Sequence, residues 1–167
     1  MLAPSLYWVT AIQPCRLALM ARPRGGDDLR IEILALQQAG IDKVVSLLEP
    51  REVAELELKD ESAVCAGYGV AFVSHPIPDR GIPSERGSFS RLMMELKDEL
   101  VAGKAIAVHC RAGIGRTGLV AGTLLHLLGI PADEAFGILS KARGVSVPDT
   151  PAQAEWVKSY VSKRGAA

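Results

Sequence analysis

A cysteine and an arginine lie six positions apart in the segment 108–118, with two glycines between them. They are Cys110 and Arg116, and the glycines are Gly113 and Gly115. A thiolate attacks phosphorus, and a guanidinium holds two phosphate oxygens at once. Glycines let the backbone N–H groups of a loop approach an anion closely. We therefore interpret this segment as a phosphate-binding loop that carries a cysteine nucleophile.

The sequence around this loop predicts the elements that hold it. An apolar run at 105–108 predicts a buried strand before the loop, and the pattern at 116–128 predicts a helix after it. The positive end of that helix favours an anion and lowers the pKa of a cysteine beside it. The Thr117 hydroxyl is a candidate hydrogen-bond donor to the sulfur. The candidate phosphate-binding residues are Arg111, Ala112, Gly113, Ile114, Gly115 and Arg116.

Strand-like and helix-like segments alternate along the rest of the chain. The predicted strands are 6–9, 17–20, 43–48, 70–73 and 105–108. The predicted helices begin near 28, 51, 60, 85, 116, 131 and 151. This order indicates a single α/β domain over residues 1–167, with a central, mainly parallel sheet of about five strands flanked by helices. Ligands of such sheets bind at the carboxyl ends of the strands, where Cys110 is expected.

Two helices are described in more detail by their sequence patterns. The first is expected to begin at Asp27 or Asp28, to end at Gly40, and to bury a face made of Ile31, Leu34, Leu36 and Ala39. Ser84 is the expected cap of the helix over 85–102.

The leaving group of a phosphate ester needs a proton, and Asp79 is the best candidate for its donor. It lies in a loop stiffened by Pro76, Pro78 and Pro83, after the strand that ends near 73. That loop should open at the same sheet edge as Cys110. The other reading is an ordinary solvated turn residue.

The histidines are the other titratable candidates. His75 is expected to end a strand, and His126 to be packed within an apolar helix with its polar atoms satisfied. His109 is expected to point away from the substrate and to hold the loop in place.

The composition limits which classes of partner the protein is expected to bind. The chain has 167 residues, 49% of them hydrophobic, with 19 lysines plus arginines against 19 aspartates plus glutamates. A zero net charge argues against nucleic acid as a partner, so anion recognition must be local. The longest apolar stretch, 119–130, is too short to cross a membrane. Three cysteines without paired or metal-type spacing, and no secretion signal, favour a cytoplasmic protein.

The segment His109–Gly118 resembles the signature loop of the cysteine-dependent protein tyrosine phosphatases: His-Cys, five residues, Arg, Ser or Thr, and Gly. Asp79, in the segment 78–83, is similar to the acid of the small dual-specificity branch. The resemblance implies that Cys110 forms a phosphocysteine, that Asp79 serves as general acid and then as base, and that Arg116 binds phosphate. It also implies that Thr117 eases departure of the thiolate, and that no metal or other cofactor is needed. Gln153 is the candidate for a water-positioning residue, with an exposed helix residue as the alternative.

The resemblance implies a phosphoprotein or phosphopeptide substrate carrying phosphotyrosine, and it leaves phosphoserine and phosphothreonine open. The uncharged Ala112 and Ile114 argue against a phosphoinositide, although Arg111 keeps that alternative, or another small phosphomonoester, open. A phosphate-binding pseudophosphatase is disfavoured because Cys110, Asp79 and Arg116 are all present.

Several residues near the predicted site have no assigned role. A cysteine redox enzyme would need a thiol relay, for which Cys15 and Cys65 have no motif, and ordinary packing is the favoured reading of both. The arginines at 22, 24 and 80 are candidates for a cationic rim, although a solvated loop is the favoured reading of Arg22 and Arg24, and Glu49 is a candidate neighbour of the site that is given no role.

Overall fold

A five-stranded sheet in the order β1-β2-β5-β3-β4 forms the centre of the molecule in a computed structural model that describes residues 3–165, and side chains as far as residue 160. β1 is antiparallel to β2, and the other four strands are parallel. The predicted α/β fold with a mainly parallel sheet is therefore confirmed. The strands are β1 (Tyr7–Trp8), β2 (Arg16–Met20), β3 (Lys43–Ser46), β4 (Ala71–Ser74) and β5 (Ala105–His109).

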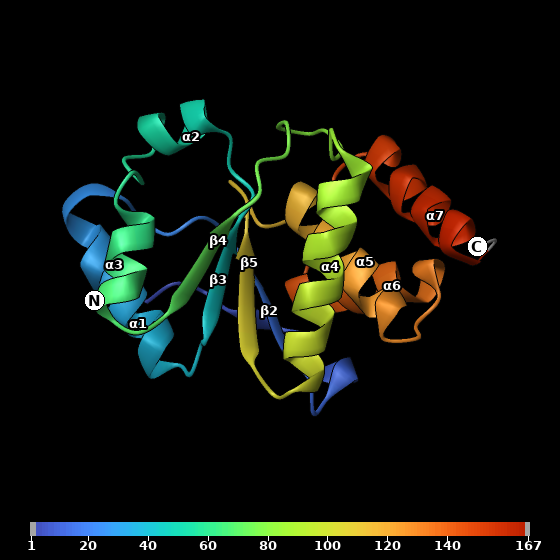
Figure 1. Cartoon of the computed structure of the whole chain (residues 1–167), viewed down its shortest axis with the longest axis horizontal. Helices are drawn as coiled ribbons and strands as arrows, with labels where there is room; N and C mark the ends of the chain where they lie inside the picture. Colours follow the sequence, from blue (N-terminus) through green and yellow to red (C-terminus); the bar gives the residue numbers. More distant parts are fainter. Residues whose placement is uncertain (1–2, 166–167) are drawn as a thin grey trace.

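Helices cover both faces of this sheet (Figure 1). On one face lie α1 (Leu29–Gln38) and α3 (Glu61–Gly67), while the short α2 (Pro50–Glu55) lies above the carboxyl ends of the strands. On the other face lie α4 (Arg86–Val101), α5 (Gly115–Leu127), α6 (Ala132–Arg143) and α7 (Pro151–Gly165). Two short 3-10 helices, η1 (Thr10–Ile12) and η2 (Gly26–Asp28), complete the described elements.

Each face of the sheet has its own apolar core, because strand side chains alternate between the two faces. Ile106 and Val108 of β5 pack with the second group of helices, whereas Ala105 and Ala107 pack with α1 and α3. β5 is buried along its whole length. It therefore gives a rigid support to whatever follows His109.

The strand order places the loop after β5 at a crevice. β2 and β3 lie on either side of β5, with His109 in register with both Met20 and Ser46. The connections after β2 and β3 leave to helices on one face, while that after β5 leads to α5 on the other face. Such a reversal of direction is where parallel α/β sheets bind ligands.

The predicted face of α1 was wrong in phase. Ile31 is 38% exposed, whereas Leu29, Ile33 and Leu36 are buried. Glu32 is buried with them because Arg24 donates a hydrogen bond to its carboxylate. A buried carboxylate on this side of the helix is not visible in a pattern of apolar residues, which is all that the predicted face was based on.

Three predicted boundaries also need correction. The cap of α4 is Glu85, whose carboxylate accepts from the Ser88 N–H at 3.3 Å, and not Ser84. β3 ends at Ser46 instead of 48, since the chain then turns into the loop before Pro50. α2 ends at Glu55 instead of 58.

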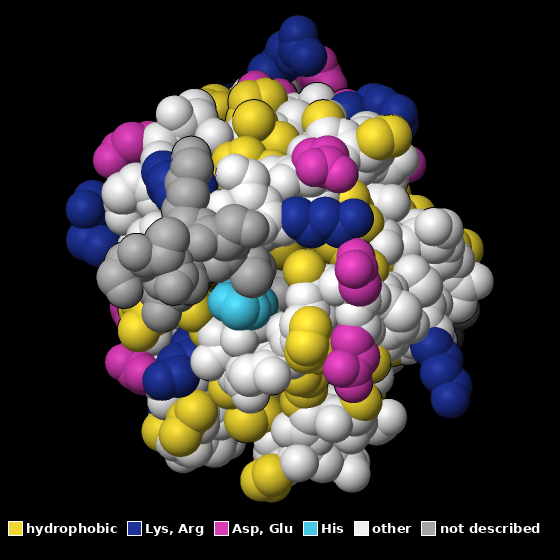
Figure 2. All heavy atoms as spheres, turned by 90° about the vertical axis from the view of Figure 1, so that its right-hand side faces the viewer, with side chains coloured by type: hydrophobic (Ala, Val, Ile, Leu, Met, Phe, Trp, Pro, Cys, Tyr) yellow, Lys and Arg dark blue, Asp and Glu magenta, His cyan; other side chains and the backbone are white. Residues whose placement is uncertain are grey.

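No helix among the described residues is long and apolar enough to cross a membrane. On the face shown in Figure 2, acidic and basic side chains are interspersed wherever the grey atoms do not cover the surface. No broad field of one sign is visible there. This distribution on the visible face agrees with the zero net charge of the sequence.

Candidate active site

Cys110 lies directly after β5, with only 3% of its surface exposed. Its Sγ accepts a hydrogen bond from the backbone N–H of Gly113 at 3.3 Å. The loop therefore curls back over the sulfur. The sulfur thus lies beside a backbone N–H donor and near the amino end of α5, where both would face an anion bound in the loop.

The two loop glycines are needed for different reasons. Gly113 has φ +75°, and a Cβ there would lie 2.3 Å from the carbonyl oxygen of Met20. Gly115 does not have a positive φ, so the reason for a glycine there is close approach alone. A Cβ on Gly115 would instead lie 2.9 Å from the Gln153 side chain. Both glycines thus permit close packing, but only Gly113 requires the special backbone.

Arg143, at the end of α6, supports the loop from outside. Its Nε donates to the carbonyl oxygen of Gly113 at 3.2 Å, and an Nη donates to that of Ala112 at 3.0 Å. In a planar trans peptide, the C=O of one residue points opposite to the N–H of the next residue. Because Arg143 holds these two carbonyl oxygens on the outside of the loop, the N–H groups of Gly113 and Ile114 point into the loop. The guanidinium also stacks on the Tyr7 ring at 4.1 Å. No sequence pattern indicated a role for this residue, because α6 follows the loop by many residues.

His109 holds the start of the loop. Its Nδ1 lies 3.1 Å from the Cys110 carbonyl oxygen, and its Nε2 lies 2.7 Å from Oε1 of Glu61. His109 and Glu61 are both buried. His109 thus lies at the start of the loop and contacts it, as expected for a supporting residue, while Glu61, its partner on α3, was missed.

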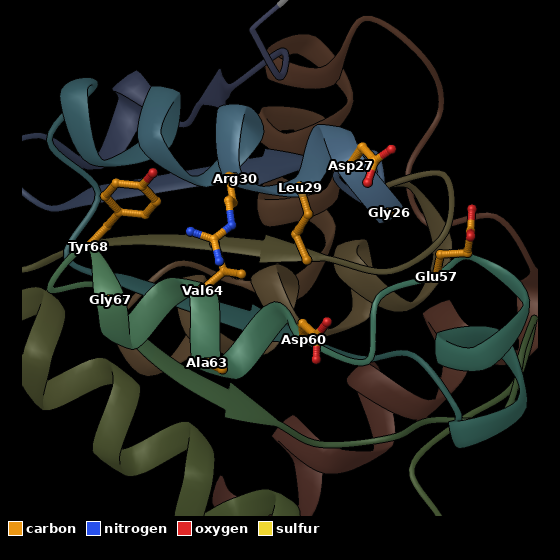
Figure 3. Close-up of a pocket in the computed structure, with 10 residues that line it drawn as sticks. All are labelled: Gly26, Asp27, Leu29, Arg30, Glu57, Asp60, Ala63, Val64, Gly67 and Tyr68. Carbon is orange, nitrogen blue, oxygen red and sulfur yellow. The ribbon is translucent and has the colours of Figure 1, made fainter.

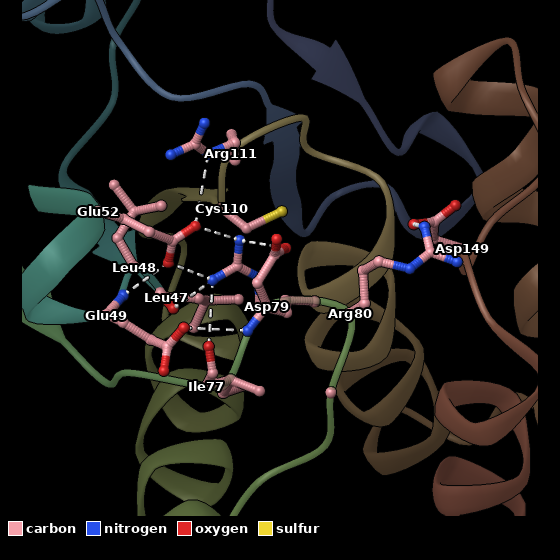
Figure 4. A network of polar contacts seen from close by, with 12 residues as sticks. Leu47, Leu48, Glu49, Glu52, Ile77, Asp79, Arg80, Cys110, Arg111 and Asp149 are labelled. Carbon is pink, nitrogen blue, oxygen red and sulfur yellow. Dashed lines mark hydrogen bonds and ion pairs between the residues drawn. The ribbon is translucent and has the colours of Figure 1, made fainter. Parts of the chain in front are cut away.

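Arg116 is 2% exposed and is held by the equally buried Glu52 of α2. Its two Nη atoms donate to the two carboxylate oxygens at 2.7 and 2.8 Å (Figure 4). Burial alone would lower the pKa of Arg116, but the bonds to Glu52 and the nearby Cys110 raise it overall. Burial likewise acts to raise the pKa of Glu52, and the hydrogen bonds from Arg116 and Glu49 outweigh it, so that pKa is lowered. Both groups are therefore held in their charged forms.

The remaining bonds of Arg116 also come from its terminal nitrogens. One Nη donates to the carbonyl oxygens of Ile77, at 3.1 Å, and Leu47, at 3.4 Å. The other donates to Oδ1 of Asp79 at 3.0 Å. Nε takes part in none of these bonds. The guanidinium is thus fixed on three sides, with the edge formed by Nε and the second Nη turned to Asp79.

Asp79 is positioned by its backbone as well as by Arg116. Its N–H donates to Oε2 of Glu49 at 3.2 Å, and the N–H of Glu49 donates to Oε2 of Glu52 at 2.9 Å. Glu49 therefore does neighbour the site, through the acid loop. The chain Glu52–Glu49–Asp79 connects the arginine support to that loop (Figure 4).

Gln153 braces the acid loop against the start of α7. It is fully buried; its Nε2 donates to the carbonyl oxygen of Gly81 at 3.2 Å, and its Oε1 accepts from the Thr150 N–H at 3.1 Å. The alternative of an exposed helix residue is therefore wrong. Arg80 makes a second tie in the same region, with an Nη 2.8 Å from Oδ2 of Asp149.

A pocket of about 250 Å³ brings these groups together. Ile114 and Gly115 come from the loop itself, and the Thr117 Oγ1 is buried behind it without a partner among the described residues. The pocket is lined by Asp79, Arg80, Cys110, Arg111, Ala112, Ile114, Gly115, Arg116, Asp149 and Gln153. Gly113 and His109 support it without lining it.

The predicted cationic rim is largely neutralised. Arg80 is paired with Asp149, and Arg24 with Glu32 and Asp28. Arg111, on the loop, is paired with Glu55 at 3.2 Å. Arg22 lies beside the loop, since its N–H donates to the Arg111 carbonyl oxygen at 3.1 Å.

The other cysteines and His126 lie outside the pocket. Burial, with a smaller effect of Glu61, raises the pKa of Cys65 to about 12. Cys15 precedes β2, and Cys110 follows β5, which places them at opposite ends of paired parallel strands. A five-residue strand separates such ends by roughly 16 Å, too far for a disulfide. His126 was expected to be satisfied, yet its Nδ1 is buried without a partner among the described residues.

Among the described residues, no group of three or more His, Cys, Asp or Glu side chains is arranged to hold a metal ion. What comes together is a cysteine, an arginine fork and a carboxylate at the switch point of an α/β sheet. These groups define a cysteine-based phosphatase site.

Comparison with protein families gives the particular class. Residues 7–160 match the family described as "PTP-SAK: Swiss Army Knife protein, DSP-PTPase phosphatase domain". The chain belongs to this family, whose members carry a phosphatase domain of the dual-specificity type.

Curated relatives agree with this placement. The chain is 30% identical over 133 residues to cyclin-dependent kinase inhibitor 3 of Rattus norvegicus, and 27% identical over 133 residues to that of Homo sapiens. Each match covers 78% of this chain and 62% of the relative. The chain thus spans less than two thirds of the length of these proteins.

Solved structures share the fold. A kinase-associated phosphatase with its catalytic-site cysteine replaced by serine has a TM-score of 0.89 at 22% identity, covering 100% of this chain and 99% of that one. Tk-PTP in its active form has a TM-score of 0.75 at 25% identity, covering 96% and 98%.

Proposed function

We propose that this protein hydrolyses phosphotyrosine in proteins, and phosphoserine and phosphothreonine as well, through a phosphocysteine on Cys110. The observation that carries this proposal is the shared pocket of about 250 Å³ lined by Cys110, Arg116 and Asp79. A nucleophile, an anion clamp and a proton donor within one small pocket are what transfer of a phosphoryl group to sulfur needs.

Arg116 binds the phosphate through the edge formed by Nε and its second Nη. Glu52 and the two carbonyl oxygens occupy the other N–H groups, so this edge is the one available for a bidentate bond. Asp79 now accepts from the second Nη at 3.0 Å. An incoming phosphate competes for that bond and releases the carboxyl to face the leaving oxygen.

In the first step the Cys110 thiolate attacks phosphorus, the bond to the leaving oxygen breaks, and Asp79 protonates that oxygen. The inward N–H groups of the loop stabilise the charge that spreads over the equatorial oxygens. In the second step water attacks phosphorus, Asp79 takes its proton, and the sulfur–phosphorus bond breaks to release inorganic phosphate.

Thr117 assists departure of the sulfur. Its buried hydroxyl has no other partner among the described residues, which supports a hydrogen bond to the thiolate. Gln153 holds Gly81 of the acid loop, and the second N–H of its amide serves to orient the water. A reducing compartment such as the cytoplasm is the setting that keeps such a thiolate active.

The test compares wild type, Cys110→Ser and Asp79→Asn on an aryl phosphate. We expect activity to be nearly abolished in the serine variant and to fall about 10²- to 10⁴-fold in the asparagine variant. Rapid acid quench of wild type with labelled substrate should trap a phosphocysteine on the peptide that contains Cys110. Full activity of Cys110→Ser would refute the mechanism.

A substrate panel then separates the substrate classes. Phosphotyrosine, phosphoserine and phosphothreonine peptides are compared with a phosphoinositide at equal concentration. We expect the phosphopeptides to give the higher kcat/KM, because Ala112 and Ile114 in the pocket wall offer no charge to additional phosphates. A higher kcat/KM for the phosphoinositide contradicts the protein substrate.

A further inference from the structure

A second and larger cavity lies away from the phosphate loop, between α1 and α3 (Figure 3). Its volume of about 790 Å³ is within the range of ligand-binding clefts. Leu29 of α1 and Val64 of α3 give it apolar walls, and Ala63 and Gly67 keep it wide. None of the residues that line it takes part in the site described above.

One end of this cavity is acidic. Asp27 of η2 meets Glu57 and Asp60 of the linker between α2 and α3 there, as Figure 3 shows. The Gly26 N–H donates to the Glu57 carbonyl oxygen at 2.9 Å, and this bond joins the segment after β2 to the segment after α2. A Cβ on Gly25 would lie 2.0 Å from the Leu56 carbonyl oxygen, so the two segments are in close contact. The backbone therefore fixes this end of the cavity.

These carboxylates have no internal partners. Among the described residues, the side chains of Asp27, Glu57 and Asp60 make no hydrogen bond or ion pair, and all three are exposed. Most acidic groups around the phosphate pocket, by contrast, are paired with arginines. The cavity thus presents unneutralised negative charge beside apolar walls, which complements a side chain with a long apolar stem and a cationic head.

The other end offers hydrogen-bond donors. Arg30 extends from α1 toward α3, and Tyr68 lies beyond it (Figure 3). Neither side chain makes a hydrogen bond or ion pair among the described residues. A guanidinium only donates, so it fits the carbonyl oxygens of an extended peptide. A small amine would contact only the acidic end, whereas a peptide with a basic side chain can contact both ends of the cavity.

The acidic end also lies toward the catalytic edge of the sheet. Gly26 follows the loop after the carboxyl end of β2, and Glu57 closely follows α2, whose Glu52 and Glu55 hold Arg116 and Arg111. Both α1 and α3 begin at this edge and lead away from it. A chain bound on the phosphate loop can therefore continue past α2 into the cavity.

We propose that the cavity between α1 and α3 is a docking site for a lysine- or arginine-containing segment of the phosphoprotein substrate, with basic side chains among Asp27, Glu57 and Asp60. This proposal rests on the proposed function for the identity of the partner. It adds a specificity determinant that acts on KM, because the cavity does not touch the reacting atoms.

The first experiment measures binding without catalysis. A short fluorescein-labelled peptide that alternates leucine with lysine or arginine is titrated into the full chain, and a twin with glutamine at each basic position serves as the neutral probe. The test variant is Asp27→Asn/Glu57→Gln/Asp60→Asn. The matched control is Asp98→Asn/Glu134→Gln/Glu155→Gln, which removes three exposed carboxylates from the helices of the opposite face.

We expect the basic peptide to bind wild type and the control equally, and the test variant about tenfold more weakly, since each exposed ion pair contributes about a factor of two. Hydrogen exchange of the complex should slow in α1 and α3. Equal weakening in both triple variants would show attraction by net charge only and would overturn the proposal. Equal affinity of the glutamine twin or of a simple polyamine would overturn it too.

The second experiment uses phosphotyrosine peptides with a basic or a neutral flanking segment. In the test variant we expect a severalfold rise in KM for the basic peptide, unchanged kcat, and unchanged hydrolysis of an aryl phosphate. An unchanged KM overturns docking of the substrate. If wild type does not hydrolyse the aryl phosphate at all, the proposed function is refuted. Failure of the docking proposal and failure of the proposed function therefore give different results.

Discussion

Replacing Glu52 by glutamine tests the support of the phosphate clamp. The Glu52 carboxylate accepts two bonds from Arg116 and one from the Glu49 N–H, and it lies 3.5 Å from Nε of Arg111. Glutamine has nearly the same shape but only one acceptor oxygen. In either orientation its NH₂ group therefore faces an N–H donor that had been satisfied.

The expected loss of stability follows from these contacts. Removing one partner of a buried ion pair costs about 3–5 kcal/mol, and a hydrogen bond to a charged group contributes about 1.5–3 kcal/mol. Arg116 keeps Asp79 and the carbonyl oxygens of Ile77 and Leu47, so the lower end applies. We expect the free energy of unfolding to fall by about 3 kcal/mol, and Tm to fall by about 6–12 °C.

Glu55→Gln is the matched control, because it makes the same chemical change on the same helix. Glu55 is 54% exposed and pairs with Arg111, which is 46% exposed. Exposed pairs contribute at most about 1 kcal/mol, so Tm should fall by less than about 4 °C. The assay is thermal unfolding followed by circular dichroism, with kcat/KM for an aryl phosphate measured on the same samples. We expect kcat/KM to fall about 100-fold in Glu52→Gln, because the fork is no longer held.

The pH dependence gives a second readout. The pKa of Glu52 is lowered in the folded protein, so its contribution to stability is present above the unfolded value of about 4.3. It is lost as pH falls through the folded value. The stability gap between wild type and Glu52→Gln should therefore narrow in acid. The reasoning is refuted if Glu52→Gln and Glu55→Gln have the same Tm at neutral pH.

Three further predictions concern groups around the site. Arg143→Leu should lower kcat/KM about 10- to 100-fold and slow the alkylation of Cys110 by iodoacetamide, because the bonds to the Ala112 and Gly113 carbonyl oxygens are lost. Lys141→Met on the same helix is the control and should change neither quantity. Equal effects of the two substitutions would contradict this role of Arg143. Burial, opposed by Glu85, lowers the pKa of His75 in the folded protein, so its contribution to stability is present above the unfolded value of about pH 6.5 and is lost as pH falls. Urea unfolding should show that the free energy of unfolding decreases less between pH 7 and pH 5 in His75→Phe than in wild type. An equal decrease in both proteins would exclude the effect. With a pKa of about 12, only about one in 10⁵ Cys65 thiols is ionised at pH 7, so mass spectrometry should find Cys65 unlabelled after Cys110 has reacted fully.

The fold and the phosphate loop were largely predictable because their signals are local. Buried parallel strands leave continuous apolar runs such as Ala105–Val108, and a loop that packs against the Met20 carbonyl oxygen needs a glycine at 113. The six-residue spacing of Cys110 and Arg116 follows from the size of a loop that curls around one anion. Each of these constraints acts within a few residues of the chain.

The missed residues around the site share one physical cause, which is charge satisfied by a partner on another element. Glu32 is buried and accepts a hydrogen bond from Arg24, so it lies on the inner face of α1, which was predicted from apolar residues alone. Glu61 and Arg143 gave no signal, because their partners are on β5 and the phosphate loop. A carboxylate or guanidinium can be buried only where its counter-charge arrives through the fold.

The sequence by itself determined the candidate nucleophile, the candidate arginine clamp and the candidate acid, and the alternation of strands and helices around them. Tertiary structure decided how these groups are held: Glu52 from α2 fixes Arg116, Glu49 holds the Asp79 N–H, and Arg143 turns the loop inward. It also decided that α1 and α3 leave an acidic cavity between them. The reason is that backbone signals act between neighbours in the chain, whereas buried charges are matched between elements that only the folded sheet brings together.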